Sequence, residues 1–275
     1  METGKANKIQ ANSFNNALSD NYHLSVQIGL THFSYCITNT STFSIEYFKS
    51  YQLNKTNDII NLINDDEVIK SDFFSSSVAF VNFPSTLIPN KVFTKQSAKE
   101  MLELNSETHE IIHTDILKEI DGHLAYSIPR ELHNIATTYF PKAKQKAQQS
   151  ILIDKFSKEY NIDPTVYLYL IENTLNITVF KNEKLIFNNS FNFETKEDIL
   201  YFTLFTFEQL KLDNNTVNTV LFGNIAKDDD NFKILYEYIR NIELGERPCQ
   251  LKFPDEFNTL ASQKYFGLFS QILCA

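Results

Sequence analysis

The feature that most constrains this chain is an order of predicted strands and helices that occurs twice along it. In the first half, alternating apolar residues rich in β-branched and aromatic types predict strands over 24–28, 33–37, 44–53 and 77–81, with a helix from residue 58. In the second half, the same criteria predict strands over 165–171, 176–180, 185–193 and 217–222, with helices over 194–212 and 231–239. Both halves therefore contain three strands, a helix, a strand and a helix, although no residue-level repeat accompanies this order.

The first half contains a further set of predicted elements. These are a helix over 94–104, strands over 109–116 and 124–128, and a helix over 129–139. The stretch 142–149, rich in Lys, Gln and Ala, is the predicted boundary, and a connecting helix follows it over 151–160. A short strand over 250–253 and a closing helix over 257–274 complete the pattern. The expected division is a loose tail over 1–20, one lobe over 21–145 and a second lobe over 146–275.

Composition and charge exclude several classes of partner. The net charge is −9 and no Lys/Arg cluster stands out, so neither nucleic acid nor an anionic membrane surface is an expected partner. The longest apolar run, 199–207, is far shorter than the ~20 residues that span a bilayer, and the N-terminal stretch lacks a signal-peptide core. Three widely spaced cysteines form no metal-type or redox pair. We therefore expect a cytoplasmic protein with no membrane insertion.

Two mixed α/β lobes of this order resemble ribonuclease-H-like lobes in tandem, the architecture of the actin, sugar-kinase and heat-shock-70 ATPases. The layout is also similar to that of actin-like cytoplasmic proteins of pilus assembly and type II secretion. A closer resemblance rests on four segments, Leu24–Gly29 with Phe33-Ser34, Val78–Phe83 with Leu87–Asn90, Tyr126–Leu132 and Tyr265–Phe269. They resemble an uncharacterised Bacteroidetes family, domain of unknown function 3822, which is described as having an actin-like ATPase fold. This resemblance implies a fold and no established activity.

An actin-like nucleotide site, which the resemblance places at two hairpins, is degraded in this sequence. Each lobe's first strand would supply an Asp for Mg²⁺, followed by Gly and hydroxyl residues whose backbone N–H groups bind phosphate. In the first lobe Gln27 stands at the Asp position, with Gly29 and Thr31 after it. In the second lobe Glu172 is the sole acid, and the expected adenosine-loop glycine pair is reduced to Gly223. If Mg-ATP binds at all, these five residues are the expected ligands.

The string His109-Glu110-Ile111-Ile112-His113 matches the zinc-protease pattern H-E-x-x-H. On a helix the two histidines would share a face and bind Zn²⁺, with Glu110 as the general base and Glu131 or His133 as a third ligand. The surrounding Thr and Ile residues instead favour a strand, on which that helical geometry is lost.

These observations leave three hypotheses of unequal weight. The favoured one is a non-catalytic actin-like scaffold or adaptor with a degenerate nucleotide site, no catalytic residue, no cofactor and a protein partner. The alternative is an actin-like ATP-binding protein or ATPase that uses atypical ligands. The minor alternative is a zinc hydrolase at His109 and His113.

Overall fold

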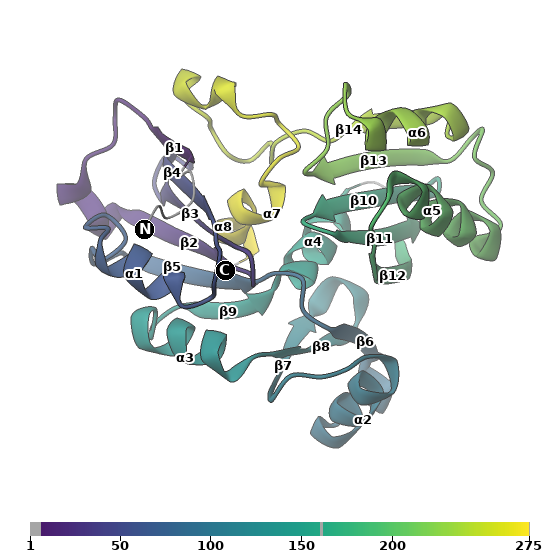
Figure 1. The fold of residues 1–275 in the computed structure, drawn as a ribbon, viewed down its shortest axis with the longest axis horizontal. Coiled ribbons are helices and arrows are strands. Elements are labelled where there is room, and N and C mark those ends of the chain that lie inside the picture. Colours follow the sequence, from purple (N-terminus) through teal and green to yellow (C-terminus); the bar gives the residue numbers. More distant parts are fainter. Residues whose placement is uncertain (1–6, 160–161, 275) are drawn as a thin grey trace.

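A computed structural model describes residues 7–159 and 162–274, and two β-sheets form its centre (Figure 1). The six-stranded sheet has the order β1-β4-β3-β2-β5-β9. Its strands are β1 (Asn7–Gln10), β2 (Tyr22–Ile28), β3 (His32–Asn39), β4 (Ile45–Gln52), β5 (Ser75–Phe80) and β9 (Lys144–Ala147). The five-stranded sheet has the order β12-β11-β10-β13-β14. Its strands are β10 (Thr165–Ile171), β11 (Thr174–Lys181), β12 (Lys184–Asn192), β13 (Asn218–Gly223) and β14 (Asn241–Leu244).

The two sheets share one strand pattern, which confirms the predicted tandem lobes. In the first, β2-β3-β4 is an antiparallel meander, and β5 and β9 continue the sheet beside β2 in parallel. In the second, β10-β11-β12 is the meander, and β13 and β14 follow beside β10 in parallel. The central strands β2 and β10 are buried along nearly their whole length. In β10 the run of apolar residues is continuous, as expected for a strand covered on both faces, whereas in β2 the buried His23, Ser25 and Gln27 alternate with apolar residues.

Helices cover the sheets and join the two lobes. They are α1 (Asp58–Asn64), α3 (Arg130–Tyr139), α4 (Gln148–Phe156), α5 (Lys196–Leu210), α6 (Asp230–Tyr238), α7 (Phe266–Phe269) and α8 (Gln271–Cys274). Short 3₁₀ helices occur at Asn16–Asn21, Asn90–Val92, Lys118–Ile120 and Asp255–Thr259. None of these helices, within the part of the chain that the structure describes, has the length and apolarity needed to cross a bilayer.

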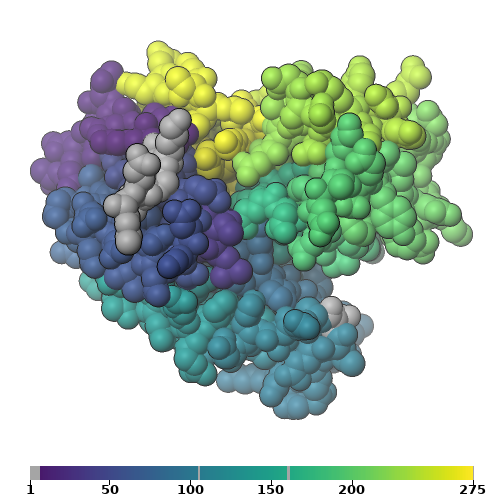
Figure 2. Space-filling view, in the orientation of Figure 1, coloured from purple at the N-terminus to yellow at the C-terminus, as the bar shows by residue number. Residues whose placement is uncertain are grey.

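A smaller unit is inserted into the first lobe between β5 and α3. It consists of the three-stranded sheet β6-β8-β7 and the helix α2 (Lys95–Asn105), with strands β6 (Ser85–Pro89), β7 (Ile111–Leu117) and β8 (Gly122–Ile128). Figure 2 shows this unit and the second lobe projecting from the same side of the first lobe, with a hollow between them. Asp115 of β7 accepts hydrogen bonds from the Ala147 backbone (2.8 Å) and Ser150 Oγ (2.6 Å), so the inserted unit caps the start of α4.

Three expectations about the lobe boundaries differ from the structure. Residues 7–10 of the expected loose tail form β1, which pairs with β4 at the edge of the first sheet. The expected linker over 142–149 contains β9 and the start of α4. The expected single closing helix is broken into short pieces, because Tyr265 adopts a left-handed backbone conformation (φ +60°) immediately before α7.

The last segment of the chain packs against the first lobe, whereas the sequence assigned it to the second. Phe257 and Phe269 are buried in one cluster with Cys36 and Phe48 of the first sheet. By packing, the first lobe therefore contains both ends of the described chain. The division after residue 145 stays a prediction.

An aromatic cluster joins the two lobes where α4 passes between them. The Phe156 ring stacks on Tyr167 at a centroid distance of 4.1 Å, and it lies 5.3 Å from Phe222 and 5.6 Å from Phe266. Tyr167 and Phe222 belong to the second sheet, and Phe156 is 2% exposed. Buried aromatic rings contribute large apolar areas, so this contact stabilises the arrangement of the lobes.

We expect Phe156→Ala to lower the free energy of unfolding by about 3–5 kcal/mol, because it leaves a cavity among three rings. Urea unfolding followed by circular dichroism measures this. Leu104→Ala is the control, since Leu104 is 84% exposed and its truncation should change stability by less than about 0.5 kcal/mol. Equal effects of the two substitutions would contradict the importance of the cluster.

Candidate functional site

The candidate site lies where the carboxyl ends of the parallel strands of both sheets meet. Ligands of open α/β sheets bind outside these strand ends. Gln27 is next to last in β2, Asn82 follows β5, and Gln148 is the first residue of α4 after β9. From the second lobe, Glu172 follows β10 and Gly223 ends β13. The fold therefore brings polar residues from both lobes to one place.

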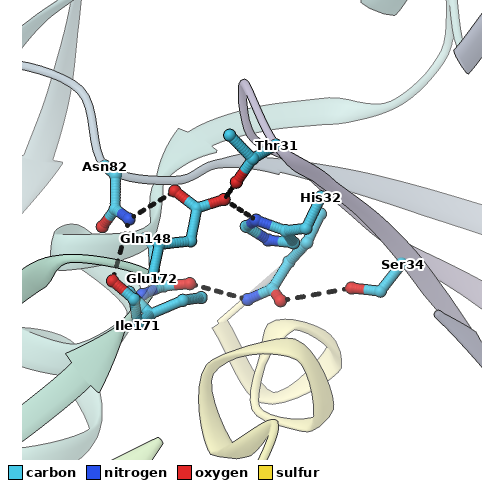
Figure 3. A network of polar contacts seen from close by, with 8 residues as sticks. Thr31, His32, Ser34, Asn82, Gln148, Ile171 and Glu172 are labelled. Atoms are coloured by element: carbon cyan, nitrogen blue, oxygen red, sulfur yellow. Dashed lines mark hydrogen bonds and ion pairs between the residues drawn. The ribbon is translucent and has the colours of Figure 1, made fainter. Parts of the chain in front are cut away.

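Glu172 is the centre of the contacts that bridge the lobes (Figure 3). One carboxylate oxygen accepts hydrogen bonds from Thr31 Oγ1 and from His32 Nδ1, the latter at 2.9 Å. The other accepts from Asn82 Nδ2 at 3.0 Å, and the same amide nitrogen donates to the Ile171 carbonyl at 3.1 Å. A single carboxylate of the second lobe is thus held by three side chains of the first.

These neighbours keep the Glu172 carboxyl ionised. Burial by itself raises its pKa, but the hydrogen bond and electrostatic attraction of His32, with hydrogen bonds from Thr31 and Asn82, outweigh that effect and lower the pKa to about 2. Hydrogen bonds to a charged carboxylate are about twice as strong as neutral ones. Glu172 is therefore an anion at neutral pH, and its charge is satisfied within the protein.

The backbone at Glu172 is in a conformation that glycine would adopt more easily. Its φ is +53°, in the left-handed region, which costs a non-glycine residue on the order of 1–2 kcal/mol. Asn82 also has a positive φ, of +60°, a region that Asn tolerates. At Glu172 the contacts of the side chain offset the cost that its backbone incurs.

A second polar contact lies beside the first, beneath the β2–β3 hairpin. Gln27 Nε2 donates to Gln148 Oε1 at 2.9 Å, and Ser34 Oγ lies 3.4 Å from Gln27 Oε1 (Figure 3). Gln27 and Gln148 are 1% and 3% exposed. A Cβ on Gly267 would lie 3.3 Å from both Gln27 Nε2 and the Tyr169 hydroxyl, so α7 approaches this pair closely. The Gln27 side chain is therefore engaged by protein groups.

A cavity of about 280 Å³ adjoins these contacts. Gln27, His32, Glu172 and Gly223 line it, together with further polar residues of both lobes, Asn7, Ser50, Gln52, Asn224 and Lys264. Its volume lies just below the ~300–1,000 Å³ of most small-molecule sites. Lys264 is the single lysine or arginine among the described lining residues. The cavity is polar and small, and it is poor in cations.

The five residues expected at a nucleotide site do come together, but two of them have other structural uses. Gly29 packs under the His32 ring, where an added Cβ would lie 2.7 Å from ring atoms. Gly223 has a φ of +87°, and an added Cβ would lie 1.9 Å from the Leu170 carbonyl oxygen, so only glycine fits there. The presence of these glycines is thus explained without a phosphate.

Sequence reasoning missed three members of the site, His32, Asn82 and Gln148. Asn82 and His32 contact Glu172 from 90 and 140 residues away, and Gln148 contacts Gln27 across 121 residues. The one available signal was position, and it existed for His32 and Asn82, which follow predicted strands; Gln148 lies in the stretch that was predicted as a boundary.

The H-E-x-x-H string does not form the helical zinc geometry. His113 lies within β7, and His109 precedes that strand. The His113 ring packs 5.4 Å from Tyr126 and 5.3 Å from His133, while His109 packs against Phe83 at 5.8 Å. Among the described residues, no group of three or more His, Cys, Asp or Glu is placed to hold a metal ion.

We expect Glu172 to make folding stability depend on acid pH. Its folded pKa of about 2 is below the ordinary value of 4.5, so its contribution is complete above about pH 5 and is lost as the pH falls toward 2. Glu172→Gln should lower the free energy of unfolding by up to about 3 kcal/mol at pH 7 and by little near pH 2. Urea titrations at both pH values measure this difference.

The exposed Glu208 on α5 provides the control, as Glu208→Gln. This variant should match the wild type at both pH values. A Glu172→Gln variant that differs from the wild type by the same amount at both pH values would show that the carboxylate charge is not what stabilises the contact.

The family described as "Protein of unknown function (DUF3822)" matches residues 11–242. No curated protein sequence matches the chain. Among solved structures, a Bacteroides thetaiotaomicron protein with an actin-like ATPase fold and unknown function is 17% identical, with a TM-score of 0.82 over 95% of this chain and 99% of that one.

Two further solved structures are more distant. A chain of the PilM–PilN type IV pilus biogenesis complex is 10% identical, with a TM-score of 0.56 over 90% of this chain and 98% of that one. The cytoplasmic domain of EpsL, an inner-membrane component of the Vibrio cholerae type II secretion system, is 9% identical, with a TM-score of 0.45 over 92% of this chain and 94% of that one. At 17% and 10% identity, the Bacteroides protein and the pilus-complex chain show the fold alone, which is that of the actin-like ATPases.

Proposed function

This chain belongs to the family of proteins of unknown function DUF3822, and within it we propose a non-catalytic, cytoplasmic actin-like scaffold or adaptor that binds another protein. The observation that carries the proposal is the Glu172 carboxylate, which is bound by Thr31, His32 and Asn82 between the two hairpins. In an actin-like site the phosphates would enter between these hairpins. Here the hairpins contact each other through their own side chains.

Charge supports the proposal. An ionised Glu172 would face an incoming phosphate, and two unit charges 4 Å apart interact by about 4 kcal/mol at the effective dielectric constant of a protein surface. Among the lining residues that the structure describes, Lys264 is the one lysine or arginine available to compensate. Gln27, at the position of the magnesium-holding acid, offers a neutral amide that Gln148 already engages.

A protein partner is supported by the fold and by a relative. PilM is present in a complex with PilN in a structure that shares this fold. Side-chain contacts across the cleft hold the two lobes in a fixed arrangement. A partner could therefore bind the surface of both lobes without a nucleotide. We infer a partner of this general kind, a protein, for the present chain.

A second candidate function is nucleotide binding through atypical ligands. The polar residues that line the 280 Å³ cavity favour this function. In a cleft that binds no ligand, apolar side chains could fill the same space. In this alternative Gln27, Gly29, Thr31, Glu172 and Gly223 would hold the nucleotide, with Glu172 as a ligand of Mg²⁺. Under the scaffold proposal the Glu172 charge lowers the affinity for a nucleotide, whereas under this alternative it raises that affinity.

We expect isothermal titration of Mg-ATP into the wild-type protein to give a Kd weaker than about 1 mM, with no phosphate release. Glu172→Gln should leave that affinity unchanged or increase it, because it removes a repulsive charge. Circular dichroism of both proteins controls for folding. Tight binding in the wild type that Glu172→Gln weakens at least about tenfold would support the alternative and contradict the scaffold.

We also expect affinity purification from the native cell to recover a stoichiometric protein partner, with the same yield whether or not Mg-ATP is added. The scaffold proposal does not depend on a nucleotide, so the yield should not respond to one. Recovery of this chain alone under both conditions would contradict the proposal.

A further inference from the structure

We propose that a groove at the amino ends of the first lobe's parallel strands is the docking surface for the partner, and that it takes an acidic peptide segment with a large apolar anchor residue. The proposal rests on the inferred protein partner and adds where it binds and what chemistry it has. The groove is lined by two segments of chain, 69–76 and 138–144, together with His23, Leu24 and Ile272.

The groove lies at the opposite end of the sheet from the candidate site. It is bordered by the first residues of β2 and β5, whereas Gln27 and Asn82 lie at or beyond the far ends of those strands. Its volume is about 670 Å³, more than twice that of the cavity between the lobes. A ligand in the groove would not touch the residues that join the hairpins.

Three buried apolar residues and the buried His23 lie at the base of the groove, and an aromatic ring is exposed beside it. Leu24, Ile69 and Phe140 are buried residues that line the groove. Phe74, which also lines it, is 72% exposed. Covering an exposed aromatic side chain with an apolar partner contributes about 1.5–3 kcal/mol, so Phe74 is suited to contact an anchor residue.

The rim of the groove is positively charged, whereas the whole chain has a negative net charge. The chain carries 34 acidic and 25 basic residues, whereas the groove is lined by Lys70, Lys142 and Lys144 and by a single acid, Asp72. Lys70 is paired with Glu67 at 2.6 Å. Lys142 and Lys144 are exposed and form no ion pair with any residue that the structure describes. Two free ammonium groups in an acidic protein favour a carboxylate-bearing partner.

The shape of the groove and its small number of positive charges favour a peptide over other anionic partners. A DNA-binding surface uses about 6–10 cationic contacts to phosphates, and this groove has two free lysines beside an exposed aromatic ring. A hollow suits an inserted peptide segment, whose apolar anchor can reach the base while its carboxylates meet the lysines and the hydroxyls of Ser75, Ser76 and Thr138.

The test is selection of a random dodecapeptide display library on the folded wild-type protein, followed by calorimetry with the enriched peptides. We expect enriched sequences to carry a net negative charge around a Leu, Ile, Phe or Trp residue. Their affinity should fall at least about tenfold with Lys142→Glu plus Lys144→Glu, and also with Phe74→Ala. Each of these positions is exposed, so both variants should keep the wild-type circular dichroism spectrum and unfolding midpoint.

Two matched variants control for charge and for loss of an exposed apolar group. Lys181→Glu plus Lys184→Glu makes the same charge change at the turn between β11 and β12, and Leu104→Ala removes an exposed side chain from α2. Both should bind the selected peptides as the wild type does. No enrichment, enrichment of basic or neutral peptides, or equal binding by all variants would overturn the proposed groove.

The groove and the scaffold function can fail separately. If a native partner co-purifies but binds the Lys142→Glu plus Lys144→Glu variant as well as the wild type, the scaffold stands and the groove is wrong. If acidic peptides bind the groove but no native partner co-purifies, the groove stands as a peptide site and the scaffold is contradicted.

Discussion

The contact that couples the two hairpins is a single carboxylate shared between the two lobes. Glu172 sits in a backbone conformation that disfavours it, yet three side chains of the other lobe hold it as an anion with a pKa of about 2. Removing one partner of such a contact leaves a partly buried charge or donor unpaired, which costs more than the contact contributes. The two hairpins are consequently coupled, because if either one moved away, these polar groups would lose their hydrogen-bond partners.

The duplicated sheets explain why this contact can form at all. Both sheets have a three-stranded meander with two further parallel strands, so each places a β-hairpin at equivalent positions. The aromatic contacts of Phe156 hold the lobes in a fixed relation on the inner side. The polar hairpins then meet at the strand ends. There the side chains of Thr31, His32 and Asn82 join the first lobe to Glu172 of the second.

Strongly patterned elements were predictable, and contacts across the fold were not. The run Thr165–Ile171 was predicted with its true bounds because its apolar residues are continuous. The edge strands β9 and β14 were missed because each has four residues and is defined by its parallel neighbour, which a local pattern does not contain. Gln27 and Glu172 could be singled out because the resemblance to an actin-like site expects an acid at the first strand of each lobe. Their partners His32 and Gln148 could not, since the contacts join residues more than 100 positions apart.

The hydrogen bonds of the polar groups between the lobes also bear on where function lies. A buried amide or carboxylate costs free energy unless it is hydrogen-bonded, and in this cleft the side-chain nitrogen of Gln27 and both carboxylate oxygens of Glu172 have protein partners. Such satisfied groups fix the geometry of the lobes, because each of them is already engaged by the protein. The groove beside Phe74 is the reverse case, with free lysines and an exposed ring that gain partners only from another molecule. A partner at that outer surface would pair groups that have no partner in the described chain, whereas a ligand at Glu172 would compete with contacts that are already made.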